Sequence, residues 1–126
     1  MKKAIIIFSA IIAIGIISCL ALTASIKKSL SQIENTEINM NNINDGVYTG
    51  HSELGPVVVD VKVEVKNHKL TKVDLVRHNC GLGHPAEAIT EKMIVQNTFD
   101  VDAVSSATVS SEIIKNAVNK ALRNSN

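Results

Sequence analysis

An uncharged apolar run near the N-terminus divides this chain into two parts that obey different folding rules. The run extends from Ala4 to Ile26, is broken only by small or hydroxyl-bearing residues, and has a pair of lysines at each end. A helix of about 20 apolar residues crosses a hydrocarbon core of about 30 Å, so this run is long enough to span a membrane. We therefore expect a membrane segment over residues 1–28, a polar tether over 29–43 and a folded domain over 44–126.

The fate of the apolar run has three readings. The run is longer than the roughly 7–15 apolar residues of a cleaved signal sequence, which favours a retained signal-anchor. Cys19 follows a sequence that resembles a bacterial lipobox, although apolar residues continue beyond it, and cleavage near Ala24 is a third route. The balanced lysine pairs leave orientation undecided by charge. Because the run is N-terminal and signal-like, we predict a single-pass anchor in a bacterial cell membrane, with the domain on the extracytoplasmic side.

The charge of the remaining chain excludes one class of partner. Without the four flanking lysines, 9 of the 13 basic residues face 12 acidic ones, a formal charge of −3. The chain holds only one Tyr, two Phe and no Trp, so it offers no stacking platform for bases. We therefore predict no nucleic-acid partner. With Cys19 in the apolar run, Cys80 stands alone and no disulfide forms within the domain.

The alternation of residues predicts a small antiparallel sheet. Valines alternate with charged residues over Val57–Lys66, which is typical of a strand with one buried face. A turn is expected at Asn67–Lys69, followed by a partner strand over Leu70–Arg77, and Tyr48 lies on a short first strand. The fold class that follows is α+β, a small antiparallel sheet with two packed helices, preceded by a transmembrane or signal-anchor helix.

Two amphipathic segments predict the helices of the domain. Pro85–Asn97 has proline near its first turn and an apolar face formed by Ile89, Met93 and Ile94. A second helix follows Ser110 or Ser111, either of which is expected to be its N-cap. In this second helix the buried face comprises Ile113, Ile114, Ala117, Val118, Ala121 and Leu122, and the solvent face comprises Lys115, Asn116, Asn119, Lys120 and Arg123.

The loop before the second helix holds the main candidate for function. Thr108 lies close to the expected helix N-terminus, where unpaired N–H groups and the helix dipole favour a phosphate. Its neighbours Ser105, Ser106 and Ala107 are small and leave room for a cofactor. A Ser/Thr-rich loop that simply caps a helix explains the same residues, so this stretch alone leaves both readings open.

The residues Asp102-Ala103-Val104-Ser105-Ser106-Ala107-Thr108 resemble the signature Asp-x-x-Ser/Thr-Gly-Ala-Thr. This is the flavin-attachment signature of the FMN-binding domain family, which includes the covalent-flavin subunits of the sodium-pumping NADH:quinone reductase and of the Rnf complex. Residues 45–50 resemble the family's opening Asp-Gly-x-Tyr-x-Gly, and the resemblance covers about the last eighty residues. The chain departs from the family at Ser106, where Gly is usual, and in the loop 78–85, which lacks a Glu-Thr-Pro sequence and keeps only Gly-x-Gly.

The resemblance implies a covalent flavoprotein. FMN would be esterified through its phosphate to Thr108 by a separate flavin transferase that uses FAD and Mg²⁺. The protein would then relay electrons between a membrane electron donor and an acceptor. Asp102 would order the attachment loop and help the transferase to recognise it. The cofactor-binding residues expected on this basis are Thr108, Asp102, Ser105, Ser106, Ala107, His78, Gly81, Leu82 and Gly83.

Other residues of the chain bear on alternative functions. No residue pattern resembles a general acid–base pair, so we predict an electron-transfer protein without catalytic residues rather than a stand-alone enzyme. His78, Cys80 and His84 could form a thiolate–imidazole nucleophile or a soft-metal site, but their spacing matches no established signature, and we predict no metal site. The alternative from another class is a flavin-free, surface-anchored binding module that retained the fold, which the serine at position 106 would favour.

Overall fold

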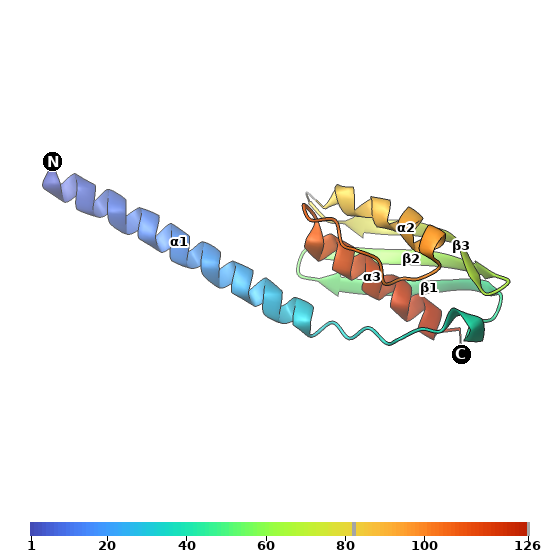
Figure 1. The fold of residues 1–126 in the computed structure, drawn as a ribbon. Coiled ribbons are helices and arrows are strands. Elements are labelled where there is room, and N and C mark those ends of the chain that lie inside the picture. Colours follow the sequence, from blue (N-terminus) through green and yellow to red (C-terminus); the bar gives the residue numbers. More distant parts are fainter. Residues whose placement is uncertain (82, 126) are drawn as a thin grey trace. The chain divides into compact units, whose positions relative to one another are not determined.

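The computed structural model describes residues 1–81 and 83–125 and divides the chain into two compact units, Met1–Gln32 and Ile33–Asn126. The first unit is a single helix, α1 (Lys2–Ser31), with no buried residue (Figure 1). Among the described residues it is the one helix long and apolar enough to cross a membrane, with a mean hydropathy of 2.9 in its most apolar window. The predicted N-terminal apolar helix is confirmed, while anchors and cleaved signals share these properties.

The second unit is built on a three-stranded antiparallel sheet in the order β1-β2-β3. Its strands are β1 (Gly46–Leu54), β2 (Val57–Lys66) and β3 (Lys69–Asn79). β2 has the predicted bounds, and β3 is longer than predicted at both ends. The turn between them contains only Asn67 and His68, both with positive φ, as a two-residue type I′ hairpin requires.

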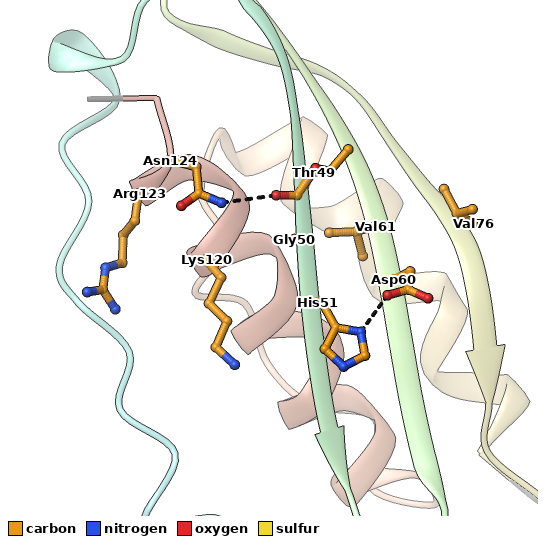
Figure 2. A pocket seen from close by; sticks show the side chains of 9 residues that line it. All are labelled: Thr49, Gly50, His51, Asp60, Val61, Val76, Lys120, Arg123 and Asn124. Carbon is orange, nitrogen blue, oxygen red and sulfur yellow. Dashed lines mark hydrogen bonds and ion pairs between the residues drawn. The ribbon is translucent and has the colours of Figure 1, made fainter.

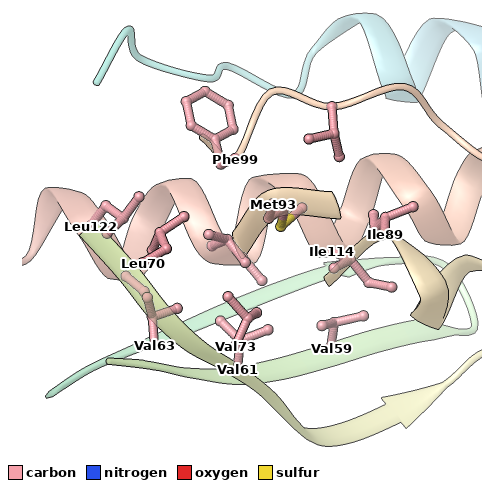
Figure 3. Close-up of a cluster of buried hydrophobic side chains, with 14 of the residues drawn as sticks. Val59, Val61, Val63, Leu70, Val73, Ile89, Met93, Phe99, Ile114 and Leu122 are labelled. Atoms are coloured by element: carbon pink, nitrogen blue, oxygen red, sulfur yellow. The ribbon is translucent and has the colours of Figure 1, made fainter. Parts of the chain in front are cut away.

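One face of this sheet carries the core. The alternate valines of β2 are buried, and two helices cover this face: α3 (Thr108–Arg123) packs on β1 and β2, and α2 (Ile89–Gln96) packs on β3 (Figure 3). The short 3₁₀ helix η2 (His84–Ala88) precedes α2, so the predicted helix from Pro85 forms as two pieces. Ile89 and Met93 are buried as predicted, and Ile94 is only partly buried. The predicted α+β class, with a small antiparallel sheet and two packed helices, is confirmed.

Two expectations about α3 are wrong. The helix begins at Thr108, so Ser110 and Ser111 lie inside its first turns and neither is the N-cap. The predicted solvent face is also largely buried, since Asn116 is 3% exposed and Asn119 is fully buried. Lys115 is 8% exposed, with its ammonium group 3.0 Å from the Asp100 carboxylate. A second layer of chain must therefore cover this side of the helix.

That layer is the segment 34–36, which two asparagines of α3 hold by hydrogen bonds. Asn119 Nδ2 donates to the Thr36 carbonyl at 2.6 Å, and the Thr36 N–H donates to Asn119 Oδ1 at 3.1 Å. Asn116 Nδ2 donates to the Glu34 carbonyl and to Asn35 Oδ1, at 3.2 and 3.0 Å. We call this arrangement the asparagine clamp. The amides match the backbone groups of a passing extended segment, which explains why polar residues are buried here.

The folded unit consequently starts earlier in the chain than the sequence suggested. A polar tether was expected over residues 29–43, but the compact unit begins at Ile33. A short 3₁₀ helix, η1 (Met40–Asn42), follows the clamped segment, and Ile43 is buried in the core at 2% exposure. The isoleucines of this otherwise polar stretch thus pack in or against the core, and only the residues of the expected tether before Ile33 lie outside the compact unit.

The glycine of the opening sequence motif has a packing role. A Cβ atom at Gly50 of β1 would lie 1.9 Å from the carbonyl oxygen of Ala117 on α3. No side chain fits in that space, so Gly50 sets the close approach of α3 to the sheet. The motif at residues 45–50 therefore contributes to the fold at a position remote in sequence from the attachment loop.

Candidate functional site

Thr108 is the first residue of α3, and its side chain is exposed. Its hydroxyl donates only a long hydrogen bond, 3.5 Å, to the Ser105 carbonyl. The residue at the cap position is Ala107, whose methyl group cannot accept a hydrogen bond from the first turn. The first N–H groups of a helix have no partner within the helix, so those of α3 remain available to an acceptor beside Thr108.

Ser111 holds the loop that leads to Thr108. Its fully buried Oγ donates to the Ala107 carbonyl at 2.8 Å and accepts from the Val104 N–H at 3.0 Å. The Ala107 N–H also donates to the Val104 carbonyl at 2.8 Å, which closes a tight turn. Asp102, expected to order this loop, is exposed and makes no side-chain hydrogen bond within the described part of the chain. Loop ordering therefore belongs to Ser111, which sequence reasoning had placed at the cap.

A pocket of about 230 Å³ opens beside Thr108. It joins the attachment loop to the loop after β3, two predicted site segments that lie far apart in the sequence. Asp102, Ser105, Gly81 and His78 do not line it, and Leu82 lies outside the described residues. The lining residues are Val57, Cys80, Gly83, Ser106, Ala107, Thr108, Val109 and Ser110.

Gly83 brings the two loops together. A Cβ atom at this position would lie 2.0 Å from Ser110 Oγ and 2.9 Å from Cys80 Cβ. Gly83 is itself buried, so its missing side chain is explained by the packing of the loop against the first turn of α3. Gly81 differs, since it has φ of +55° and open space around it. Of these two glycines, Gly83 therefore forms the wall of the pocket, and Gly81 provides the turn.

The substitution of serine for glycine at position 106 causes no backbone strain. Among the described residues other than glycine, positive φ occurs at Asn67, His68 and Asn97, and Ser106 is not one of them. Ser106 is exposed on the rim of the pocket. The steric penalty expected for a left-handed conformation therefore does not apply, and the main argument for a flavin-free module loses its basis.

Next to this pocket, two histidines lie within hydrogen-bond distance of the Glu87 carboxylate. His78 Nδ1 and His84 Nδ1 lie 2.9 and 3.2 Å from the same oxygen of Glu87. The His78 side chain is only 3% exposed, whereas His84 is 71% exposed. Hydrogen bonds from His78 and then from His84 hold the pKa of the Glu87 carboxyl below its ordinary value. Glu87 was not foreseen, although its position three residues after His84 on a helical turn was a usable signal.

A larger pocket, about 670 Å³, lies elsewhere, at the other end of α3 (Figure 2). Beside it Asp60 pairs with His51 and with Arg77, and the hydrogen bond from His51, then that from Arg77, lowers the pKa of Asp60. His51 and Arg77 are exposed and Asp60 is half-buried, and no predicted site residue belongs to this pocket. Its lining residues are Thr49, Gly50, His51, Asp60, Val61, Val76, Lys120, Arg123 and Asn124.

Comparison with known proteins identifies the family of the chain. The model of the FMN-binding domain family matches residues 54–123, which is more than half of the chain and includes Thr108 and both loops of the pocket. The crystal structure of the CPE2226 protein from Clostridium perfringens has a similar fold, with a TM-score of 0.52 and 17% identity over 66% of this chain and 88% of that one. No curated protein matches the chain. The chain belongs to the FMN-binding domain family, whose function is to bind flavin.

Proposed function

We propose that this member of the FMN-binding domain family is a membrane-anchored flavoprotein that carries FMN on Thr108 through a phosphoester bond. Its role is to relay electrons between a membrane electron donor and an acceptor. The observation that supports the proposal is the exposed Thr108 hydroxyl at the first residue of α3, on a pocket and beside an uncapped helix end.

The surroundings of Thr108 suit a phosphate. α3 has sixteen residues, and the partial positive charge of its first turn stabilises an anion by roughly 0.3–1 kcal/mol at an exposed site. Ala107 leaves the first-turn N–H groups free of a competing side-chain acceptor, since it carries only a methyl group. The long 3.5 Å hydrogen bond to Ser105 is weak, so the Thr108 hydroxyl loses little when it is esterified.

The size of the pocket indicates which part of the cofactor it holds. Small-molecule sites enclose roughly 300–1,000 Å³, and this pocket encloses about 230 Å³. It therefore fits the phosphate end of FMN and not the whole molecule. The apolar side chains of Val57 and Val109 at its edge offer contacts to the part of the cofactor that extends beyond it.

The attachment step follows from the chemistry of FAD. The Thr108 oxygen forms a bond to the phosphorus atom of the FMN half, the pyrophosphate P–O bond breaks, and AMP leaves. The hydroxyl proton passes to a base of the transferase, whose Mg²⁺ neutralises the pyrophosphate charge. Ser111 contributes by fixing the loop, because its two hydrogen bonds hold residues 104–107 in one geometry.

Once attached, FMN supplies the transfer of one or two electrons, and the protein supplies position and access. Thr108 holds the phosphate covalently, the first-turn N–H groups solvate it, and the packing of Gly83 on Ser110 closes one wall of the pocket. None of these contacts requires a general acid or base, which is consistent with a carrier rather than an enzyme.

The anchor in this proposal is α1. Its thirty residues extend about 45 Å at 1.5 Å per residue, which exceeds a hydrocarbon core of about 30 Å. We place the domain on the extracytoplasmic side because the run is N-terminal and signal-like. Protease treatment of intact protoplasts checks this: digestion of the domain is the expected result, and a protected protein would contradict the orientation.

The attachment is tested by co-expression of the full-length chain with a flavin transferase. The denatured protein is expected to fluoresce as a flavin on a gel, and peptide mass mapping is expected to find FMN on the peptide that contains Thr108. Thr108→Ser should retain flavin and Ser105→Ala serves as the matched control that also retains it. A folded protein without bound flavin would instead support the flavin-free binding module, and flavin on Ser105 or Ser106 would refute the assignment to Thr108.

A further inference from the structure

Two histidines and a cysteine converge between the end of β3 and the start of η2, and the flavin chemistry proposed above does not use them. One donor atom from each of His78, Cys80 and His84 lies within 4.8 Å of the other two. We call these three residues the His–Cys–His cluster. Imidazole nitrogen and thiolate sulfur are the ligands that zinc and similar borderline-soft metals prefer.

The neighbouring carboxylate fixes which histidine atoms are available. The Nδ1 atoms of His78 and His84 lie 2.9 and 3.2 Å from the same carboxylate oxygen of Glu87, so both nitrogens face an acceptor. An ionised carboxylate only accepts hydrogen bonds, so both Nδ1 atoms carry their hydrogen. In the neutral imidazoles each Nε2 atom therefore keeps a lone pair. A carboxylate that orients a histidine in this way is the usual outer partner of a metal-ligating imidazole.

The Nε2 atom of His78 is an orphan. It is buried and has no hydrogen-bond partner within residues 1–81 and 83–125, in a side chain that is 3% exposed. A buried polar atom without a partner costs roughly 1–3 kcal/mol, so such an atom needs an explanation. A metal ion bound to the lone pair of Nε2 provides one.

The backbone places the three side chains on one side of the loop. His78 lies near the end of β3 and Cys80 directly follows its last residue, with their donor atoms within 4.8 Å of each other. Gly81, with φ of +55°, reverses the chain, and the Gly83 N–H donates to the Cys80 carbonyl at 2.9 Å. This turn returns His84 to the side of Cys80. The exposed His84 side chain leaves a path by which an ion can enter.

We propose that the His–Cys–His cluster binds a zinc-type divalent metal ion through Nε2 of His78, Sγ of Cys80 and Nε2 of His84. Water completes a tetrahedron, and the Cys80 proton is released to solvent on binding. Ligand atoms around tetrahedral zinc lie about 3.3–3.6 Å apart, and one donor atom of each residue already lies within 4.8 Å of the others, so a small contraction closes the cluster on one ion. Rotation of the exposed His84 side chain permits this contraction.

The metal site is independent of flavin attachment. Cys80 also lines the pocket of Thr108, but neither the metal ligands nor Glu87 includes a residue of the attachment loop. The test therefore uses the Thr108→Ala variant beside the unmodified chain. Both are expected to bind metal equally, so failure of the flavin proposal would leave the metal proposal standing.

The experiment is a titration of the full-length protein in detergent with Co²⁺, after removal of metals with a chelator and without a transferase. One equivalent is expected to give the visible bands of tetrahedral cobalt together with a thiolate-to-cobalt charge-transfer band, and Zn²⁺ should abolish both. Cys80→Ser should lose the charge-transfer band. Cys19→Ser is the matched control and should keep it, because Cys19 lies on α1 in the other unit. Glu87→Gln should weaken binding by about 10–100-fold.

Three outcomes would overturn the proposal. The first is binding without a charge-transfer band, the second is a band that survives Cys80→Ser, and the third is affinity unchanged in His84→Gln. Because His84 is exposed, this last variant is expected to fold, which far-UV circular dichroism verifies. A rise in the unfolding temperature of the unmodified protein with Zn²⁺, absent in His84→Gln, provides a second and independent measurement.

Discussion

The first turn and the middle of α3 both carry polar side chains, but they use their hydrogen-bonding capacity differently. At the middle, Asn119 donates and accepts within the asparagine clamp, and Asn116 accepts at 2.7 Å from Ser52 Oγ in addition to its two donated bonds. At the first turn, Thr108 has an exposed hydroxyl with one long bond and no side-chain cap beside it. Saturated polar groups on this helix hold the fold, while the unsaturated ones remain available for chemistry.

The largest effect is expected from Thr108→Ala, which should remove covalent flavin completely. The variant deletes the only hydroxyl at the attachment position, and the exposed side chain contributes little to packing. Mass spectrometry and the unfolding temperature are measured together. Loss of flavin with an unchanged unfolding temperature supports the distinction between the first turn and the middle of α3. A large loss of stability would contradict that distinction.

A substitution in the asparagine clamp should have the opposite effect to Thr108→Ala, lowering stability while leaving flavin attached. Asn119→Ala leaves the Thr36 N–H and carbonyl without their partners, which is expected to cost about 2–3 kcal/mol of unfolding free energy. For a unit of this size that corresponds to a fall of roughly 10 °C or more in the unfolding temperature. Flavin attachment at Thr108 should persist below that temperature. Lys120→Ala, at the exposed neighbouring position, is the control and should change stability little.

An intermediate effect is expected where the two loops meet. Gly83 has φ of −82°, so Gly83→Ala causes no backbone strain and tests the close contacts with Ser110 and Cys80, of which that with Ser110 Oγ is the shortest. Overpacking of this kind costs about 1–3 kcal/mol. The second change Ser110→Ala should recover part of the loss, because it removes the oxygen that the new methyl group meets. Equal destabilisation with and without Ser110→Ala would show that the contact is elsewhere.

The clamp should also be insensitive to pH, because amides do not titrate. Glu87 has a lowered pKa in the folded protein, so its contribution is present above its ordinary value of 4.5 and is lost as pH falls through the folded value. Glu87→Gln is therefore expected to reduce the loss of unfolding free energy at acidic pH. Asn119→Ala should instead lower the unfolding free energy by the same amount at every pH. A pH-dependent effect of that variant would contradict the role of the amide hydrogen bonds.

The smallest effect is predicted for Ser106→Gly. Ser106 is exposed and does not have a positive φ, so glycine relieves no strain there and stability should change by less than about 0.5 kcal/mol. Flavin loading should be equal to or slightly greater than that of the unmodified protein. A large fall in loading, measured by absorbance of the denatured protein, would show that the Ser106 hydroxyl has its own role at the first turn.

The parts of this structure that could be predicted are those governed by local patterns. The alternation of Val59, Val61 and Val63 with charged residues defines a strand and its buried face within a few positions. The buried stripe of α3 was predicted from helical periodicity for the same reason. The exposure of Asn116 and Asn119 was predicted wrongly, because the segment 34–36 that covers them lies more than eighty residues earlier in the chain.

In the candidate site, too, the features set by local sequence could be predicted and those set by loop packing could not. Thr108 was identified from a contiguous motif next to a helix, and its position at the helix start differs by only a few residues from the expected one. The contact of Gly83 with Ser110 and the roles of Ser111 and Glu87 could not be predicted, because they depend on how two loops pack. No periodicity in the sequence encodes such contacts.

The asparagine clamp also sets an order of events during synthesis. It joins Thr36 to Asn119, a separation of 83 residues, so the partner of this segment is made 83 residues after it. Chain elongation adds roughly 5–20 residues per second, so residues 34–36 wait for seconds before they can be covered. Closing such a long loop is slow and occurs only once α3 is complete. The segment 34–36 is consequently covered only after the middle of α3 has been made.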